Sequence, residues 1–140
     1  MPEKSTTTDL EQRIREWVEA VNRRDWDGYF KIFSPDVIWD TSALGMGVFE
    51  GRDSIRTGFE DYLEAFEEYE VRLDEFHDLG NGVTLFVAFD RARPKGSSAF
   101  LEDRFADLAI WADGLIERAT TYTDIDQARA DAERLAEERG

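Results

Sequence analysis

The spacing of apolar residues predicts a pair of helices at the start of the chain. Over about residues 9–23, apolar side chains recur every three or four positions, which is the period of an amphipathic helix. Thr8 and Glu11 stand three positions apart before this stretch and fit a capping box. Asp25 can cap a second, short helix that ends at Ser34-Pro35, because the residue before a proline disfavours helical geometry. This pattern therefore predicts that the first quarter of the chain forms a helical hairpin.

The rest of the chain alternates between strand and helix patterns. A β-branched and aromatic run at 37–39 predicts a short strand, and glycines then punctuate an irregular loop over 41–51. Beyond residue 68, runs of strand-type residues are separated by turn signals such as Asn81-Gly82 and Asp113-Gly114. The strands predicted in this part are 69–79, 83–92, 98–111 and 115–123. Three consecutive antiparallel hairpins follow from this order.

Two further helices complete the predicted fold, one starting at Asp53 and one following Asp124. The element order α-α-β-α-β-β-β-β-α places helices on one face of a curved antiparallel sheet, which is an α+β architecture. Long strands must bend, and a bent sheet covered by helices leaves a concave interior that suits one small ligand. A chain of 140 residues is the right size for one such domain with one core.

The charge of the chain narrows its possible partners. Asp and Glu total 32 against 17 Lys and Arg, which gives a net charge of -15. Such a field repels phosphate backbones and anionic lipids, so we expect neither a nucleic-acid partner nor a membrane partner. No stretch has the apolar length of a membrane-spanning helix or the pattern of a signal peptide, and a cytoplasmic location is expected.

The residue types also narrow the chemistry. The chain has no cysteine and a single histidine, His77, which excludes disulfides and the zinc motifs built on cysteine and histidine pairs. Gly45, Gly47 and Gly51 miss the spacing of a dinucleotide-binding loop. We therefore expect no metal and no cofactor.

Three short motifs, in this order and at these separations, resemble a known family. They are Val-Ile-Trp-Asp-Thr-Ser at 37–42, the helix start Gly51-Arg52-Asp53, and the hairpin Ala-Asp-Gly-Leu-Ile at 112–116. Together with the element order, they resemble the SnoaL-like branch of the nuclear transport factor 2-like superfamily, which has the ketosteroid isomerase-like fold. That superfamily includes isomerases, dehydratases, cyclases, epoxide hydrolases and non-catalytic binding modules.

The resemblance implies a domain division and an oligomeric state. It implies an NTF2-like, or cystatin-like, α+β barrel over 9–125 in which a cone-shaped curved antiparallel sheet is packed by N-terminal helices. A disordered N-terminus over 1–8 and a C-terminal helix or tail over 126–140 would flank this domain. The resemblance also implies a homodimer through the outer face of the sheet, and the apolar Leu108 and Ile110 on one face of a long strand agree with it.

The ketosteroid isomerases of this superfamily imply roles for particular residues. Their general-base aspartate falls on Asp40 at the end of the first strand, and their hydrogen-bond-donating aspartic acid falls on Asp107. Their oxyanion-binding tyrosine falls on Trp17, which departs from the pattern but keeps one N–H donor. The implied activity is a cofactor-free isomerase, cyclase or dehydratase that moves a proton on a small, apolar, carbonyl-bearing molecule.

An apolar cavity would suit this chemistry, because it desolvates carboxylates and raises their pKa values. The side chains expected to contact the ligand are Trp17, Phe30, Phe59, Tyr62, His77 and Phe105. His77 has the one side chain whose unperturbed pKa lies near neutrality, and a half-exposed strand histidine is the interpretation that we favour over a catalytic one. Tyr69 and Tyr122 are interpreted as core or interface residues.

Structural interpretations of both aspartates stay open. Asp40 can instead cap the turn into the loop that follows it, and Asp107 can instead pair with an arginine across the sheet. In that case the chain is a non-catalytic module that binds a small hydrophobic ligand or serves dimerisation.

Glu102-Asp103-Arg104 offers a different set, because epoxide hydrolases of this superfamily activate water with an Asp-Arg-Asp arrangement. Strand alternation puts Asp103, Phe105 and Asp107 on one face, and Glu102 and Arg104 on the other. We therefore expect Glu102 and Arg104 to take part in ion pairs across the sheet, and we do not expect Arg104 to act with Asp107.

Overall fold

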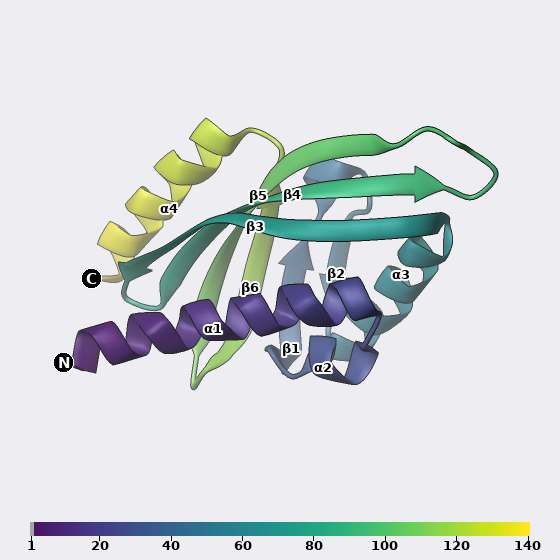
Figure 1. Ribbon diagram of the computed structural model, residues 1–140. Helices are drawn as coiled ribbons and strands as arrows, with labels where there is room; N and C mark the ends of the chain where they lie inside the picture. The colour runs from purple at the N-terminus through teal and green to yellow at the C-terminus, as the bar shows by residue number, and fades with distance from the viewer. Residues whose placement is uncertain (1) are drawn as a thin grey trace.

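The computed structural model describes residues 2–140, and the side chains of residues 9–140. The first helix, α1, spans Pro2–Arg23 and packs along the sheet (Figure 1). The expected capping box at Thr8 and the expected disordered segment over 1–8 fall outside the described side chains and stay predictions. No described helix is both long enough and apolar enough to cross a membrane.

The second helix, α2, is shorter than predicted and spans Trp26–Phe30. Asp25 caps it as expected, since its Oδ1 accepts a backbone N–H of the first turn at 3.1 Å. The chain then enters strand β1 (Phe33–Asp40) before the proline. The reason is long-range pairing: the Ile116 backbone N–H donates to the Ile32 carbonyl at 2.7 Å, which fixes an extended chain there.

One curved sheet of six strands forms the centre of the molecule, in the order β2-β1-β6-β5-β4-β3. After β1 the strands are β2 (Val48–Glu50), β3 (Phe66–Gly80), β4 (Val83–Pro94), β5 (Leu101–Ala112) and β6 (Leu115–Tyr122). The three hairpins from β3 to β6 are antiparallel, as predicted. At two of the turns, Asn81-Gly82 and Asp113-Gly114 take positive φ angles, which a tight hairpin turn of this kind requires. The α+β class and the curved sheet are therefore confirmed.

The first strand differs from the expectation of a purely antiparallel sheet. β1 pairs with β6 in parallel, so the sheet is mixed. The loop predicted over 41–51 contains a short 3-10 helix, Ser42–Leu44, and the strand β2, which pairs antiparallel with β1. Since β2 and β3 are the two edges, the sheet is curved but not closed.

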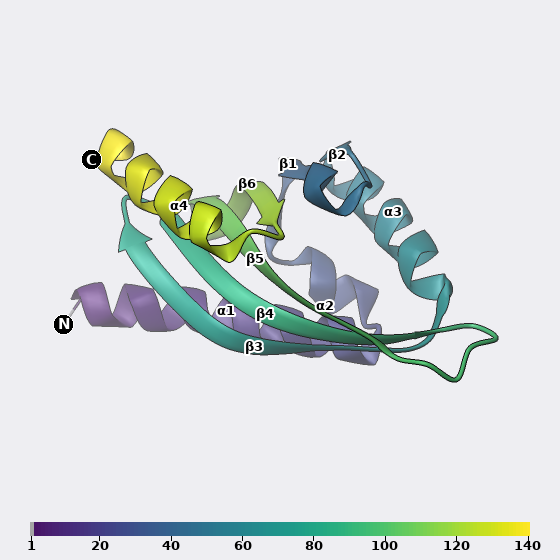
Figure 2. The same ribbon diagram turned by 90° about the horizontal axis from the view of Figure 1, so that it is seen from above.

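Helices cover both faces of the sheet. α1, α2 and helix α3 (Arg52–Glu64) pack on the concave face, where they share a large aromatic core with the inner side chains of the strands. Helix α4 (Ile125–Arg139) lies on the opposite face (Figure 2). The prediction that all helices lie on one face is wrong for α4.

Small side chains let α4 approach the outer face of the sheet closely. Ala128, Ala132 and Ala136 are buried against Leu85 and Leu108 of β4 and β5. Leu108, which we expected to contribute to a dimer interface, is therefore covered within the chain itself. A homodimer stays a prediction, and it would have to use surface that α4 leaves open.

Candidate functional site

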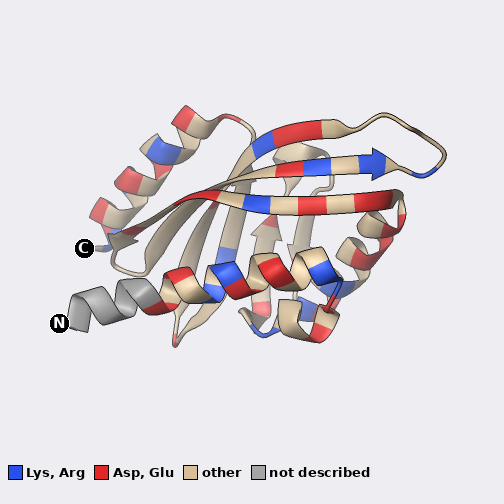
Figure 3. Ribbon diagram, viewed as in Figure 1, with Lys and Arg blue, Asp and Glu red and all other residues tan. Residues whose placement is uncertain are grey.

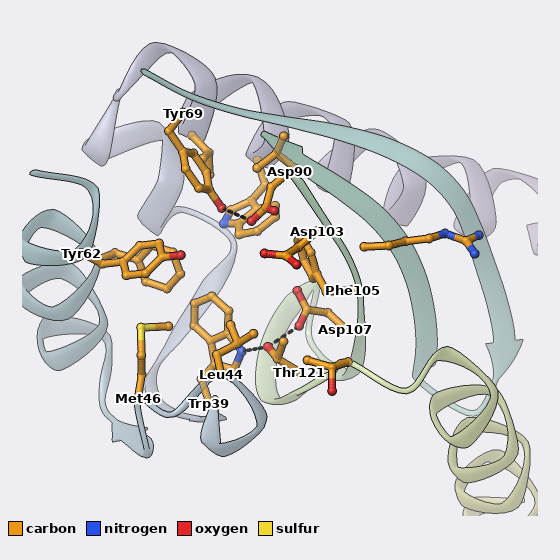
Figure 4. Close-up of a pocket in the computed structure, with 16 residues that line it drawn as sticks. Trp39, Leu44, Met46, Tyr62, Tyr69, Asp90, Asp103, Phe105, Asp107 and Thr121 are labelled. Atoms are coloured by element: carbon orange, nitrogen blue, oxygen red, sulfur yellow. Dashed lines mark hydrogen bonds between the residues drawn. The ribbon is translucent and has the colours of Figure 1, made fainter. Parts of the chain in front are cut away.

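A cavity of about 330 Å³ opens on the concave face of the sheet. Its walls come from α1, α3, the strands β1 and β3 to β6, and the loop after β1, which contributes Leu44 and Met46 (Figure 4). Its aromatic residues are Trp17, Trp39, Phe59, Tyr62, Tyr69 and Phe105. The size and the largely apolar lining are typical of a site for one small molecule.

Asp107 is the most buried carboxyl group of this cavity. Its residue is 4% exposed on the inner face of β5, beside Phe105 and Asp103 as strand alternation predicts. Burial raises the pKa of Asp107 to about 7, and a hydrogen bond from Thr121 partly offsets this rise. Asp107 also borders a void of about 20 Å³ whose other walls are almost entirely apolar. At neutral pH both protonation states of this carboxyl are therefore populated.

A chain of hydrogen bonds orients Asp107. The indole Nε1 of Trp39 donates to Thr121 Oγ1 at 2.9 Å, and the Thr121 hydroxyl donates to Asp107 Oδ1 (Figure 4). Trp39 is itself stacked on Phe59, with ring centroids 4.8 Å apart and planes 10° from parallel. The Asp107 Oδ1 atom is thus held by neighbours on β1 and β6, while no described hydrogen bond occupies Oδ2.

Trp17 presents a buried donor that makes no hydrogen bond of good geometry. Its residue is 7% exposed and lines the cavity, and its Nε1 is buried without a hydrogen-bond partner among the described side chains. The Tyr29 hydroxyl is buried in the same condition, and burial raises the pKa of Tyr29 well above its ordinary value, an effect that the neighbouring Trp17 side chain partly offsets. A buried N–H that lacks an acceptor costs free energy until a ligand supplies one. The donor role expected for Trp17 stays a prediction.

Two further carboxyl groups line the same wall: Asp90, which the sequence analysis did not single out, and Asp103, which it considered only within the alternative set around Arg104. Asp90 on β4 accepts a hydrogen bond from the Tyr69 hydroxyl at 2.9 Å, and Asp103 lies opposite Asp90 in the β4–β5 register (Figure 4). Burial is the main cause of a raised pKa for both Asp90 and Tyr69. The signal for Asp103 was available, because alternation already put it on the face of Asp107.

Three of the predicted site residues lie elsewhere. Asp40 is not part of the cavity wall: its Oδ1 accepts the Ser42 backbone N–H at 2.9 Å, and hydrogen bonds from Ser42 lower its pKa. The turn-capping interpretation of Asp40 thus fits the geometry, and the general-base role does not. His77 is exposed and lies 2.9 Å from Glu75 at its Nε2, and Phe30 is a core residue outside the cavity.

The alternative set around Arg104 is not assembled. Arg104 borders the cavity, but its guanidinium binds the Glu75 carboxylate at 3.0 Å, and Glu75 also binds Arg129. Glu102 pairs with Arg91 at 3.4 Å, as expected for an ion pair across the sheet. No Asp-Arg-Asp arrangement therefore faces the cavity within the described side chains.

Trp17, Phe59, Tyr62 and Phe105 do line the cavity as predicted. Trp39 also lines the cavity, and the sequence analysis did not predict this. An aromatic residue in a short strand is equally typical of a core position, so its sequence context could not reveal the role.

The sequence matches the SnoaL-like domain over residues 14–119. The chain belongs to the SnoaL-like family. No curated protein matches the sequence.

Solved structures of the same fold cover nearly the whole SnoaL-like chain. An NTF2-like protein of unknown function from Burkholderia pseudomallei is 21% identical, with a TM-score of 0.72, and the match covers 89% of this chain and 97% of that one. A Catenulispora acidiphila protein with a ketosteroid isomerase-like fold, solved in complex with trimethylamine, is 16% identical over 86% and 91% of the chains, with a TM-score of 0.71. An LEH-like epoxide hydrolase from M. tuberculosis is 14% identical over 91% of both chains, with a TM-score of 0.68. At these identities the likeness establishes the fold alone.

Proposed function

We propose that this SnoaL-like protein is a cofactor-free proton-transfer enzyme acting on a small, mostly apolar, carbonyl-bearing molecule. The observation that carries the proposal is the Asp107 carboxyl, buried in an aromatic cavity with a pKa raised to about 7. A group with this pKa can accept and return a proton at neutral pH, which is what a general acid–base needs.

The geometry supports a two-step reaction. Asp107, as the carboxylate, takes a proton from the carbon next to the carbonyl, and the C–H electron pair moves into the carbonyl to give an enolate. The enolate oxygen accepts a hydrogen bond from Trp17 Nε1, the buried donor beside Tyr29 that makes no hydrogen bond of good geometry within the described side chains. When the substrate carries a double bond between its β and γ carbons, the enolate is conjugated with that bond, and Asp107 returns the proton to the γ carbon. The double bond moves next to the carbonyl, so the product is an isomer of the substrate and all atoms balance.

In this proposal Asp107 replaces Asp40 as the base, because Asp40 is held outside the cavity by Ser42. Support also comes from the family. Related folds include an enzyme, the LEH-like epoxide hydrolase, and a protein that holds a small organic molecule, trimethylamine, so the fold accommodates both catalysis and small ligands.

Solvent exchange provides the test. Small cyclic ketones and enones are incubated with the protein in deuterium oxide, and loss of the α-proton signal is followed by NMR. We expect the wild-type protein to accelerate exchange, with a rate that rises as the pH passes through about 7, and we expect Asp107→Asn to lose this acceleration. Asp40→Asn removes a carboxylate outside the cavity and should leave the rate unchanged.

Either of two results would overturn the proposal: exchange that persists in Asp107→Asn, or no accelerated exchange of any ketone that binds the wild type. The second result would favour the other candidate function, a non-catalytic module for small hydrophobic ligands. That candidate draws its support from the position of Asp40, since the cavity lacks the base that the ketosteroid isomerases place there.

A homodimeric state and a cytoplasmic location are also proposals. The first rests on the family resemblance and the second on the cysteine-free composition. Light scattering coupled to size exclusion checks the first, and a monomer at all concentrations would contradict it.

A further inference from the structure

The cavity is acidic, and no cation within the described part of the chain neutralises it. Figure 3 shows acidic residues in red on the neighbouring strands β4 and β5, which supply its wall. Asp90, Asp103 and Asp107 lie along one wall, and none of them makes an ion pair among the described side chains. The one arginine at the cavity, Arg104, has its guanidinium on Glu75. The three carboxyl groups therefore project a negative potential into a space with low-dielectric walls, where charges act more strongly than in water.

The three carboxyl groups do not form a metal site. Among the described residues, no group of three or more acidic or histidine side chains is arranged so that it could hold a metal ion. They are graded by depth instead: Asp103 is exposed at the mouth, Asp90 is half-buried, and Asp107 is buried. A charge spread along a wall suits an organic cation better than a compact ion that needs converging ligands.

The opposite wall is aromatic. Trp39 and Phe59 are stacked, and Tyr62 lies edge-on to Phe59 with ring centroids 6.1 Å apart. Figure 4 shows Tyr62 and Met46 across the cavity from the aspartates. Aromatic faces attract ammonium groups through their quadrupoles, and this attraction strengthens when the site is dry. Carboxylates that face aromatic rings thus favour binding of a cation with apolar substituents, such as an alkylated ammonium group.

The unpartnered Trp17 N–H adds a second requirement. Trp17 lines the cavity, and its N–H makes no hydrogen bond of good geometry even to the neighbouring Tyr29, so a ligand oxygen that reaches it would complete the site. This requirement is independent of the charge of the aspartates.

We propose that the molecule this cavity takes is an amino-carbonyl or amino-alcohol compound, whose cationic amine lies between Asp90 and Asp103 on one side and Tyr62 on the other while its oxygen accepts from Trp17. The inference deepens the proposed function and rests on it for the carbonyl, since it names the class of substrate for the same site. It also makes anionic carbonyl compounds poor ligands, because no described cation in the cavity would receive them.

Two probes of nearly equal shape isolate the charge. Choline carries a quaternary ammonium and a hydroxyl oxygen, and 3,3-dimethylbutan-1-ol is its neutral carbon counterpart. Binding is measured by calorimetry, and independently by tryptophan fluorescence, since Trp17 and Trp39 are in the wall. At about 0.15 M salt and pH 8 we expect choline to bind at least about tenfold more tightly than the neutral alcohol.

Variants then assign the charge to its residues. Asp90→Asn and Asp103→Asn should each weaken choline binding by about fivefold and leave the neutral alcohol unaffected. Asp40→Asn is the matched control, because it removes one carboxylate from the same protein outside the cavity. Trp17→Phe removes the N–H donor and should weaken both probes alike, since both offer the same hydroxyl.

The pH dependence is a further readout, because choline keeps its charge at every pH. Affinity for choline should rise by up to about tenfold between pH 6 and 8 as Asp107 ionises, and Asp107→Asn should abolish this rise. The titratable groups facing Asp107 are Tyr29 from α2, Tyr69 from β3, Asp90 from β4 and Asp103 from its own strand. The tyrosines stay neutral over this range because burial raises their pKa values, so they do not mimic the effect.

The inference is wrong if the neutral alcohol binds as tightly as choline, or if Asp40→Asn weakens choline as much as Asp90→Asn does. This outcome is distinguishable from failure of the proposed function, which is read by proton exchange on ketones and needs no cation. Proton exchange on ketones without a preference for choline would support the proposed enzyme and refute the cationic substrate class. A preference for choline without proton exchange would refute the enzyme and indicate a non-catalytic module that binds amines.

Discussion

Replacing Asp107 by asparagine should make the protein more stable, and by an amount that grows with pH. The substitution keeps the size of the side chain, and the asparagine carbonyl can still accept the hydrogen bond from Thr121. What it removes is the possibility of a buried negative charge. Most substitutions of a buried, hydrogen-bonded residue destabilise a protein, so a gain in stability would be specific to this reasoning.

The magnitude follows from the pKa. Folding raises the pKa of Asp107 from 3.8 to about 7, a difference of about 3 units, and each unit corresponds to about 1.4 kcal/mol. Below pH 3.8 the carboxyl is protonated in both the folded and the unfolded state and contributes nothing. As the pH rises, the unfolded state loses the proton first, so the wild-type protein loses stability until the folded state ionises as well at about pH 7. The full penalty is about 4 kcal/mol, and the part that develops between about pH 5 and pH 8 is about 3 kcal/mol.

Urea unfolding of the wild type and of Asp107→Asn, at pH 5 and at pH 8, measures this difference. The free energy of unfolding of the variant minus that of the wild type should increase by about 3 kcal/mol between the two pH values. Asp40→Asn is the control, because hydrogen bonds from Ser42 lower the pKa of Asp40, so loss of its charge should not stabilise the protein at either pH. If the difference for Asp107→Asn changes by less than about 1 kcal/mol between the two pH values, Asp107 is not the buried, desolvated acid described above.

Other substitutions test the packing and the hydrogen bonds around the site. Gly58→Ala should lower the free energy of unfolding by about 1 to 3 kcal/mol in spite of the better helix propensity of alanine, because the new Cβ would collide with the Phe49 ring; chemical denaturation measures this, and an unchanged stability would mean that the ring moves aside freely. Thr121→Val should raise the pKa of Asp107 above about 7, since the Thr121 hydroxyl favours the charged form, and carboxyl ¹³C NMR would follow it. The same variant should cost about 1 to 3 kcal/mol of stability because the Trp39 indole loses its acceptor, and a pKa of Asp107 that falls would contradict the assigned bond.

Local patterns predicted most of the fold. The periods of apolar residues and the Asn81-Gly82 and Asp113-Gly114 turns located the helices and the three hairpins. What they could not predict was pairing between distant segments. The parallel contact of β1 with β6 and the strand β2 depend on partners far away in the sequence, and a three-residue strand has too few positions to reveal a period.

The candidate site was predicted in part for the same reason. Alternation along β5 correctly put Asp107 and Asp103 on one face, because a strand fixes this without tertiary information. Asp40 was assigned by resemblance, although alternation with the buried Trp39 already pointed it away from the core. The bond between Tyr69 and Asp90 joins residues 21 positions apart on neighbouring strands, and only the β3–β4 register brings them together.

The covering of both faces of β5 has a consequence for how the site responds to a guest. Asp107 lies between Ala106 and Leu108 along β5, and the side chains of these two neighbours are buried against α4 on the opposite face of the sheet. The strand therefore cannot recede to let water reach the carboxyl from behind when it ionises. Groups that solvate or neutralise the ionised Asp107 carboxylate, whether water or a ligand, must therefore enter through the mouth of the cavity. Binding of a cationic ligand is thus linked to release of the Asp107 proton. Calorimetry of its uptake in buffers of different ionisation enthalpy would record the proton leaving, whereas a neutral apolar ligand would favour the protonated form.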